Sequence, residues 1–88
     1  MSYRLEFTRE AQRSLRKMDK HQAILITRWL YQHVDGVADP RSFGKGLTAN
    51  RSGEWRYRIG NYRVIVEIQD DRLVVLALQI GHRRSVYD

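Results

Sequence analysis

The 88-residue sequence contains no cysteine and a single proline, Pro40. Without cysteine the chain cannot form a disulfide, bind a metal through thiolates or use a thiol as a nucleophile. No apolar run approaches the roughly 20 residues that a membrane-spanning helix requires. The N-terminal segment 1–7 carries charges and lacks the apolar run of a signal peptide. We therefore expect a cytoplasmic protein made of one domain, residues 1–88, with a modest core.

Motifs of metal-dependent and cofactor-dependent enzymes are also missing. The three histidines, His21, His33 and His82, are scattered, and no histidine–carboxylate group has metal-ligand spacing. The Gly-Lys-Gly segment 44–46 lacks the earlier spaced glycine and the Ser or Thr after the lysine that a nucleotide-binding loop needs. We therefore expect no metal and no cofactor. Lys45 remains a candidate phosphate contact, or else a solvated lysine.

Acidic residues are outnumbered by basic ones, 10 to 16, and 13 of the basic residues are arginine. The net charge is +6, and each half of the chain, 1–44 and 45–88, holds eight basic and five acidic residues. The excess is thus not a basic tail. Such a balance suggests a nucleic acid or an acidic protein as partner, although many small proteins carry solvated charge of this kind.

Hydrophobic periodicity predicts an α+β fold with an N-terminal strand, a helical hairpin and a three-stranded antiparallel meander. The expected elements are a strand at Tyr3–Phe7, a helix from the N-cap Thr8 to about Met18, a helix from Asp19 or Lys20 to about Val34, and strands at Trp55–Ile59, Tyr62–Gln69 and Arg72–Ile80. The segment 35–53 has no clear period, and a loop of that length is often functional.

The second helix has an inward stripe made of Ala23, Ile26, Leu30 and Val34. Leu25 and Trp29 fall outside this stripe. Two interpretations remain open for them: packing against the first helix or the sheet edge, or an apolar patch that binds a partner.

The last strand is apolar on both faces, which predicts a central position in the sheet. A two-residue turn at Asp70-Asp71 would pair Ile65 with Leu76 and Val66 with Val75. It would also bring Gly81 near Gly60, so that the C-terminal segment leaves the sheet beside the turn between the first two strands of the meander.

That turn, Gly60-Asn61, joins two strands with arginine on one face. A two-residue loop pairs Arg58 with Arg63, and Arg56 shares their face. Like charges in direct cross-strand pairs destabilise a sheet. Arginine binds phosphate oxygens with two parallel hydrogen bonds, so the cluster favours an anionic ligand, against the alternative of a solvated face.

The C-terminal segment adds His82, Arg83, Arg84 and Tyr87 near this cluster. Tyr87 could stack on a base or transfer a proton, and His82 could act as a general acid or base. Alternatively, Tyr87 anchors the tail and His82 is a solvated turn residue.

Three segments together resemble the RelE group of the RelE/ParE toxin superfamily: EWRYRIGNYRVIVEI at residues 54–68, DDRLVVL at 70–76 and IGHRRSVY at 80–87. The resemblance covers essentially the whole chain. It implies a RelE-like α+β domain in which a helical hairpin packs on a largely antiparallel twisted sheet. It also implies a type II toxin that cleaves mRNA in the ribosomal A site, without metal, and that a cognate antitoxin inhibits. Operator DNA would be contacted only through the antitoxin.

The resemblance also implies roles for individual residues. The catalytic set would be Arg56, Arg58, Arg63, Arg83 and Tyr87, and the further RNA contacts would be Lys45, His82 and Arg84. Some members carry lysine at the two strand positions 56 and 58, where this chain has arginine, which does not serve as a base. The general base is therefore left unassigned. Two alternative functions remain: a ParE-like toxin that poisons DNA gyrase, and a non-catalytic RNA-binding module.

Overall fold

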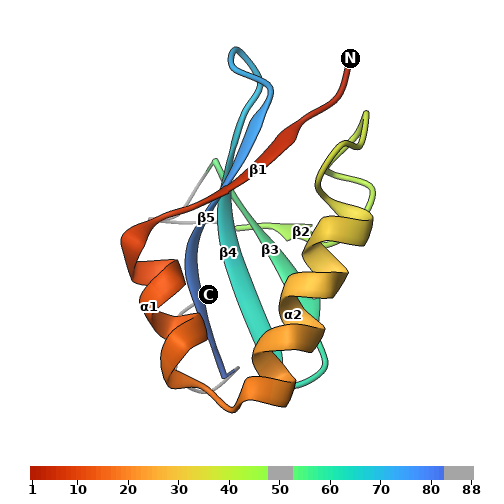
Figure 1. Cartoon of the computed structure of the whole chain (residues 1–88). Helices are drawn as coiled ribbons and strands as arrows, with labels where there is room; N and C mark the ends of the chain where they lie inside the picture. The colour runs from red at the N-terminus through yellow and green to blue at the C-terminus, as the bar shows by residue number, and fades with distance from the viewer. Residues whose placement is uncertain (48–52, 83–88) are drawn as a thin grey trace.

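The computed structural model describes residues 1–47 and 53–82, which form two helices and a five-stranded sheet (Figure 1). In chain order the elements are β1 (Arg4–Phe7), α1 (Arg9–Lys17), α2 (Lys20–His33), β2 (Lys45–Gly46), β3 (Glu54–Ile59), β4 (Tyr62–Gln69) and β5 (Val74–His82). The predicted α+β fold is confirmed. Among the described residues, neither helix is long and apolar enough to cross a membrane.

The first helix begins at the predicted N-cap Thr8, and the second begins within the predicted range, with Asp19 as its N-cap. The Thr8 hydroxyl oxygen accepts a hydrogen bond from the Ala11 N–H at 3.1 Å, and the Asp19 carboxylate accepts one from the Gln22 N–H at 3.3 Å. Such caps satisfy backbone donors that have no partner inside the helix. Gly36, with φ 77°, follows the second helix closely, as the sequence predicts.

The sheet has the strand order β1-β5-β4-β3-β2. β1 runs parallel to β5, and all other neighbours are antiparallel. Both helices lie on the same side of the sheet (Figure 1). β5 lies between β1 and β4 beneath the helices, which confirms its predicted central position. The opposite side, which we call the open face, is not covered by either helix.

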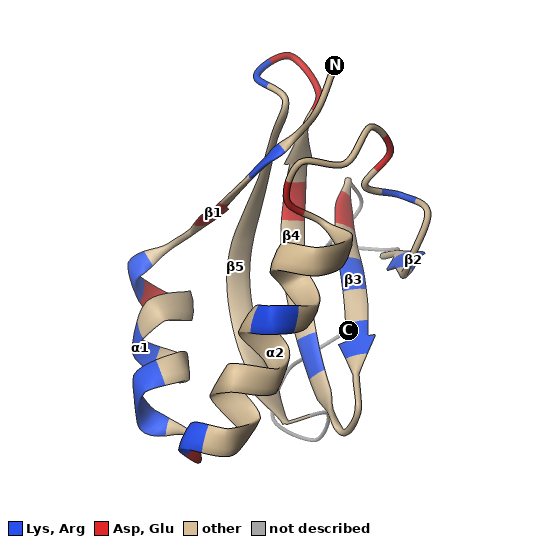
Figure 2. Ribbon diagram, turned by 45° about the vertical axis from the view of Figure 1, so that its right-hand side comes forward, with Lys and Arg blue, Asp and Glu red and all other residues tan. Residues whose placement is uncertain are grey.

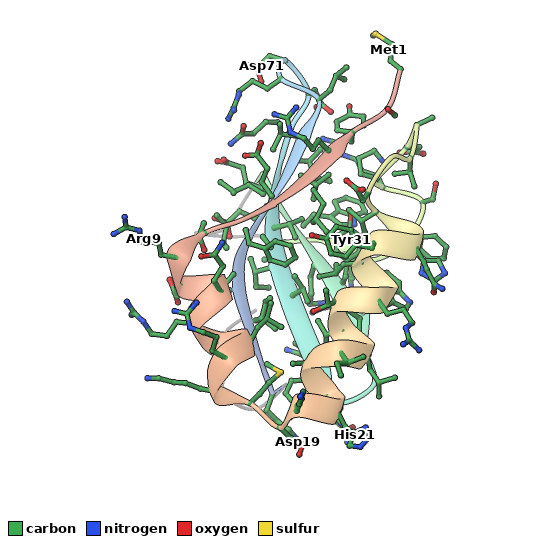
Figure 3. All side chains as sticks on the ribbon, in the orientation of Figure 1. Met1, Arg9, Asp19, His21, Tyr31 and Asp71 are labelled. Carbon is green, nitrogen blue, oxygen red and sulfur yellow. The ribbon has the colours of Figure 1, made fainter. Side chains whose placement is uncertain are left out.

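The main core fills the space between the helices and the sheet (Figure 3). The helix residues that are buried in it are Ala11, Ile26, Leu30 and Val34. Ala23, the other member of the predicted stripe, is only partly buried. Trp29 packs against this core, which agrees with the packing interpretation, whereas Leu25 is 52% exposed.

Two details of the chain differ from the sequence prediction. The segment 35–53 is not entirely loop, because Lys45–Gly46 forms β2 and pairs with β3. The turn between β4 and β5 spans residues 70–73, since Gln69 pairs with Val74. Leu73 in this turn has φ 54°, a left-handed conformation that lets a longer turn close the hairpin.

The predicted register of β4 on β5 is therefore wrong. Ile65 pairs with Gln79 and Val66 with Ala77, and Leu78 is the extra residue of a β-bulge between these pairs. An apolar strand that is buried on both faces carries no alternation to fix its register. The bulge also directs Leu78 to the open face, where it packs with Ile65.

Candidate phosphate-binding site

Arg56, Arg58 and Arg63 lie together on the open face of the sheet. Alternation along β3 turns its apolar residues toward the helices and its arginines away from them. Arg58 pairs directly with Arg63 across the β3–β4 turn, as the sequence predicts. The basic positions of the two strands lie side by side in Figure 2. The open face thus presents three guanidinium groups on adjacent strands, which we call the arginine cluster.

The arginine cluster borders a second, small hydrophobic cluster. This cluster is formed by the buried Leu47 and Ile65 and the partly buried Leu78. Arg58 is exposed, whereas Arg56 and Arg63 are partly buried and the Nε atom of Arg63 is buried. Charges beside apolar groups are screened less by water, so an anion bound here would interact strongly with them.

Arg63 lies between Gly81 and Arg58 in the sheet. Gly81 contributes no side chain to the open face beside it. On β3, the side chain of Arg58 forms no hydrogen bond or ion pair with another described residue. Arg58 and Arg63 thus face each other at a cost to stability, which an anion bound to Arg58 would offset.

Lys45 joins the same face through β2. It pairs directly with Arg56, and directly paired residues point to the same side of a sheet. The Leu47 N–H donates to the carbonyl of Glu54 at 3.1 Å, which holds the end of β2 against β3. The sequence prediction had Lys45 in an irregular loop, but the structure brings it into line with the arginine cluster.

Gly44 and Trp55 support this position of Lys45, and neither is among the site residues that the sequence predicts. A Cβ atom at residue 44 would overlap the backbone oxygen of Arg56 and lie 2.7 Å from the indole nitrogen of Trp55. Residue 44 also has φ 84°, which favours glycine. The Trp55 indole N–H donates to the carbonyl of Phe43 at 2.6 Å. The nearby glycines 44 and 46 were the sequence signal for this close approach.

The chain before β2 is fixed by two further interactions. The buried Tyr57 hydroxyl donates to the carbonyl of Pro40 at 2.5 Å, and burial raises the pKa of Tyr57 well above its usual value. Arg41 forms a two-bond ion pair with Asp70 at 3.0 and 3.1 Å, and the Tyr3 hydroxyl also donates to Asp70. The Arg41 and Tyr3 hydrogen bonds lower the pKa of Asp70. These contacts orient the segment that leads to Lys45.

His82 lies at the same end of the sheet as Arg63 but on the other face. It pairs with Tyr62, and their rings meet edge to face at 5.6 Å between centroids. Tyr62 packs against the main core, so this pair belongs to the helix side of the sheet. The structure does not bring the His82 side chain into the arginine cluster.

β5 ends at His82, beside the β3–β4 turn, as expected. The predicted position of Gly81 near Gly60 is wrong, because Gly81 pairs with Arg63. The remaining candidates, Arg83, Arg84 and Tyr87, lie outside the described residues.

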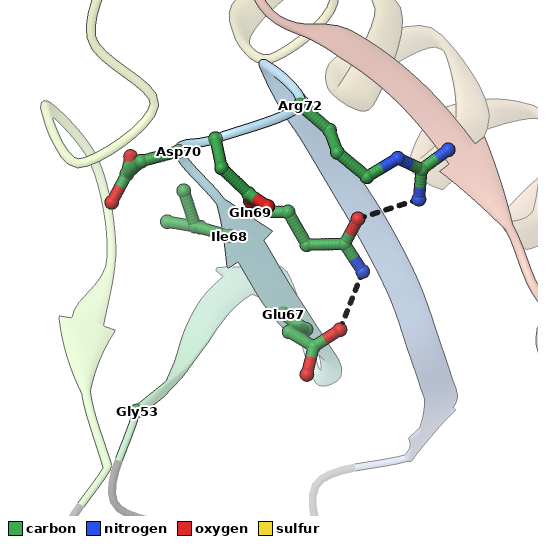
Figure 4. A pocket seen from close by; sticks show the side chains of 7 residues that line it. Gly53, Glu67, Ile68, Gln69, Asp70 and Arg72 are labelled. Atoms are coloured by element: carbon green, nitrogen blue, oxygen red, sulfur yellow. Dashed lines mark hydrogen bonds between the residues drawn. The ribbon is translucent and has the colours of Figure 1, made fainter.

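The opposite end of the β3–β4 hairpin is acidic. Glu54 pairs with Glu67, and a pocket of about 610 Å³ lies beside them (Figure 4). The pocket is lined by Gly53, Glu67, Ile68, Gln69, Asp70, Asp71 and Arg72. Three carboxylates make this pocket unsuitable for a phosphate. Across residues 1–47 and 53–82, no three histidine or carboxylate side chains are grouped as metal ligands would be.

A helical hairpin on one face of a mixed five-stranded sheet is the architecture of RelE-type toxins. A chain of the toxin–antitoxin complex RelBE2 from Mycobacterium tuberculosis matches with a TM-score of 0.85 and 26% identity, covering 94% of this chain and 93% of that one. The isolated RelE toxin of E. coli shares the fold, with a TM-score of 0.72, 19% identity and coverage of 92% and 84%.

Sequence comparison leads to the same group. The family model described as the ParE toxin of the type II toxin–antitoxin system parDE matches residues 5–87 of the sequence. The chain therefore belongs to this family. Toxin RelG of Mycobacterium tuberculosis is 28% identical over 87 residues, which is 99% of this chain and 98% of that protein. Within the RelE/ParE superfamily the chain is therefore RelE-like, as its sequence motifs predict.

Proposed function

We propose that this chain is a ribosome-dependent endoribonuclease that cleaves mRNA in the A site and so inhibits translation. The observation that carries the proposal is the arginine cluster, Arg56, Arg58 and Arg63, on the open face. Guanidinium groups hold phosphate oxygens by paired hydrogen bonds and stay protonated at working pH. Similarity to RelE-type toxins supports the same assignment.

The proposed reaction is attack of a ribose 2′-oxygen on the adjacent phosphorus. The new P–O2′ bond forms as the P–O5′ bond breaks, which leaves a 2′,3′-cyclic phosphate and a 5′-hydroxyl group. The 2′-hydroxyl loses a proton, and the leaving 5′-oxygen gains one. Rate acceleration then depends on in-line positioning and on stabilising the extra negative charge of the phosphorane.

Each candidate residue has a role in this reaction. Arg58 and Arg63 hold the scissile phosphate, while Arg56 and Arg83 stabilise the charge that develops on it. Tyr87 stacks on or orients the nucleotide. The flanking RNA backbone is contacted by Lys45 and Arg84.

The arginine cluster contains no general base for the proton transfers of this reaction. Arginine keeps its proton, and His82 pairs with Tyr62 on the helix side of the sheet. We therefore assign no general base within the arginine cluster, keep His82 only as an RNA contact, and assign the bent substrate geometry to the ribosome. Tyr87 is the remaining protein candidate for a proton transfer.

We further propose that residues 1–88 act as one domain and that the protein works in the cytoplasm, bound to no membrane. We also propose that a cognate antitoxin inhibits it. RelE-type toxins have been crystallised as RelB–RelE complexes. Ile24, Leu25 and Tyr31 expose large apolar side chains on α2 and are candidate anchors for such a partner.

The proposal is tested by incubating purified protein with ribosomes that carry mRNA and mapping new 5′ ends. Arg63→Ala and Arg83→Ala should each abolish cleavage without unfolding the protein. Arg72→Ala, an arginine in the β4–β5 turn, is the matched control and should cleave normally. Normal cleavage by a folded Arg63→Ala/Arg83→Ala double variant would disprove the catalytic assignment. Binding without any cleavage by the unmodified protein would identify an RNA-binding module instead.

A second candidate function is supported by the family model, whose description is that of a ParE toxin. In that case the protein would poison DNA gyrase, as the ParE-like branch does. Expression in bacteria separates the two candidates, because a translation block precedes DNA damage in the first case and follows it in the second. We favour the first candidate because poisoning of gyrase does not require the arginine cluster.

A further inference from the structure

Helix α1 carries a second basic surface, separate from the arginine cluster. Its four basic residues, Arg9, Arg13, Arg16 and Lys17, are all exposed. Spacings of four, three and one along an α-helix gather them on one face. This face is opposite Ala11, which is fully buried in the main core. We call these four residues the α1 basic stripe.

The stripe has no ion-pair partner in the part of the protein that the structure describes. None of its members forms an ion pair or a side-chain hydrogen bond with another residue in 1–47 or 53–82. Arg9 and Arg13 are four residues apart, as are Arg13 and Lys17, and like charges at this spacing destabilise a helix. Arg9 also lies in the first turn, where the helix dipole disfavours positive charge.

Figure 2 shows the stripe on the outer side of α1, away from the basic positions of β3 and β4. Figure 3 shows Arg9 pointing outward into solvent. α1 packs on the helix side of β5, whereas the arginine cluster lies on the open face of β3 and β4. An RNA strand held at the arginine cluster would therefore leave the stripe free to contact a second polyanion.

The composition of α1 identifies the kind of partner. The exposed large apolar residues in the described chain are Met1, Ile24, Leu25, Tyr31 and Phe43, and none belongs to α1. Protein interfaces depend on buried aromatic and aliphatic anchors, and anionic membranes bind helices that also have an apolar face. A row of cations without apolar anchors is suited to a phosphate backbone, where each contact releases condensed counterions. Arg9 and Lys17 are about 12 Å apart along the helix, enough to contact several phosphates.

We infer that the α1 basic stripe is a non-catalytic docking surface for the backbone of structured, double-stranded RNA, as presented by the ribosome. This inference rests on the proposed function, because ribosomal RNA is chosen as the partner on the ground that the protein acts on the ribosome. The stripe holds the protein on the ribosome while the arginine cluster acts on the mRNA.

The test compares two triple variants with equal charge. The stripe variant is Arg9→Gln/Arg13→Gln/Lys17→Gln, and the control is Arg4→Gln/Arg28→Gln/Arg72→Gln. Each lowers the net charge from +6 by three to +3, and glutamine has nearly the helix propensity of arginine and lysine. Binding to mRNA-free ribosomes and to a 20-base-pair RNA duplex is measured between 50 and 200 mM salt.

The stripe variant should bind both RNAs about 10- to 100-fold more weakly, and its slope of log K against log salt should be shallower by about 2 to 3. The control should lose less than about threefold. Thermal unfolding should show the stripe variant to be at least as stable as the parent, because like-charge pairs are removed. In the cleavage assay its KM should rise while kcat is unchanged.

Equal weakening by both variants would overturn the inference, because net charge alone would then explain binding. Failure of the parent protein to bind either RNA would also overturn it, as would equal weakening toward polyglutamate. These binding measurements do not depend on cleavage. A protein that binds through the stripe but cuts no mRNA would refute the proposed function and leave this inference intact.

Discussion

The β3–β4 hairpin carries two like-charge pairs on its open face, and their surroundings differ. Near the turn Arg58 faces Arg63, and at the far end Glu54 faces Glu67. The side chain of Glu67 accepts a hydrogen bond from the amide of Gln69 at 2.6 Å. The side chain of Arg58, in contrast, has no hydrogen bond or ion pair among the described residues.

The same contrast extends beyond the two pairs. At the acidic end the Gln69 amide oxygen accepts a hydrogen bond from Arg72 at 2.7 Å, and Asp70 is paired with Arg41 and Tyr3. Charge there is balanced by the protein itself. At the basic end a small cluster of buried apolar residues and Gly81 adjoin the arginines. A like-charge pair whose side chains the protein engages is a structural feature, whereas one in which the Arg58 side chain has no partner among the described residues is a candidate binding site.

The largest expected effect is on mRNA cleavage, when one charged residue is replaced at either the basic or the acidic end of the β3–β4 hairpin. Arg58→Gln should reduce mRNA cleavage about 10²- to 10³-fold, which is typical for loss of one charge-stabilising donor in a transition state. Glu67→Gln should change cleavage less than about threefold. Both rates are measured on ribosomes with mapped 5′ ends, at equal amounts of folded protein. Equal losses in the two variants would show that the ends of the hairpin do not differ in function.

The basic end also depends on β2, which is tested at Gly44. Gly44→Ala should lower the free energy of unfolding by about 2–3 kcal/mol, because the new Cβ would overlap the backbone of Arg56. Gly36→Ala is the matched control. It shares a positive φ of 77° but has no atom within 4 Å of the added Cβ, so a cost of about 1 kcal/mol is expected.

Urea unfolding measures both glycine variants. If they lost equal stability, backbone strain alone would explain Gly44, and its close approach to β3 would be irrelevant. Cleavage by refolded Gly44→Ala should also fall, since Lys45 would no longer lie opposite Arg56.

A smaller effect is expected at Tyr57, beneath the basic end. Tyr57→Phe should cost about 1–2 kcal/mol in urea unfolding, because the carbonyl of Pro40 loses its buried donor. Tyr31→Phe changes a tyrosine that is 51% exposed and should be neutral. Unchanged stability of Tyr57→Phe would mean that water replaces the hydroxyl and that this contact does not fix the segment before β2.

Features of the fold and the site that depend on a few adjacent residues could be predicted from the sequence. Thr8 and Asp19 marked the helix starts because their side-chain oxygens can cap N–H groups. The two-residue Gly60-Asn61 turn fixed the pairing of Arg58 with Arg63. Both features require only a few adjacent residues.

Features that depend on distant contacts could not be predicted. Lys45 reaches the arginine cluster because β2 pairs with β3, and a two-residue strand has no periodicity to detect. The register of β4 on β5 depends on a four-residue turn and on the bulge at Leu78, whereas Asp70-Asp71 alone suggested a two-residue turn. His82 was assigned to the arginine cluster by its position in the chain, but side-chain alternation along β5 directs it to the other face.

The smallest expected effect is a pH-dependent change in stability at the acidic end. It tests whether Arg41 and Tyr3 stabilise the ionised carboxylate of Asp70. Hydrogen bonds from Arg41 and Tyr3 lower the pKa of Asp70 from its usual 3.8. A carboxyl whose pKa is depressed by folding stabilises the protein fully above its unfolded pKa, and this contribution is lost as pH falls through the folded pKa. Asp70→Asn should therefore have a slightly lower melting temperature than the parent above about pH 5.

The difference between Asp70→Asn and the parent should shrink as pH falls below 3.8 and disappear below the lowered pKa of folded Asp70, where the parent carboxyl gains its proton. Melting temperatures at pH 2–7 in low salt measure it, and the effect is small because the ion pair is exposed. A constant difference down to pH 2 would mean that Arg41 and Tyr3 do not hold the ionised carboxylate of Asp70.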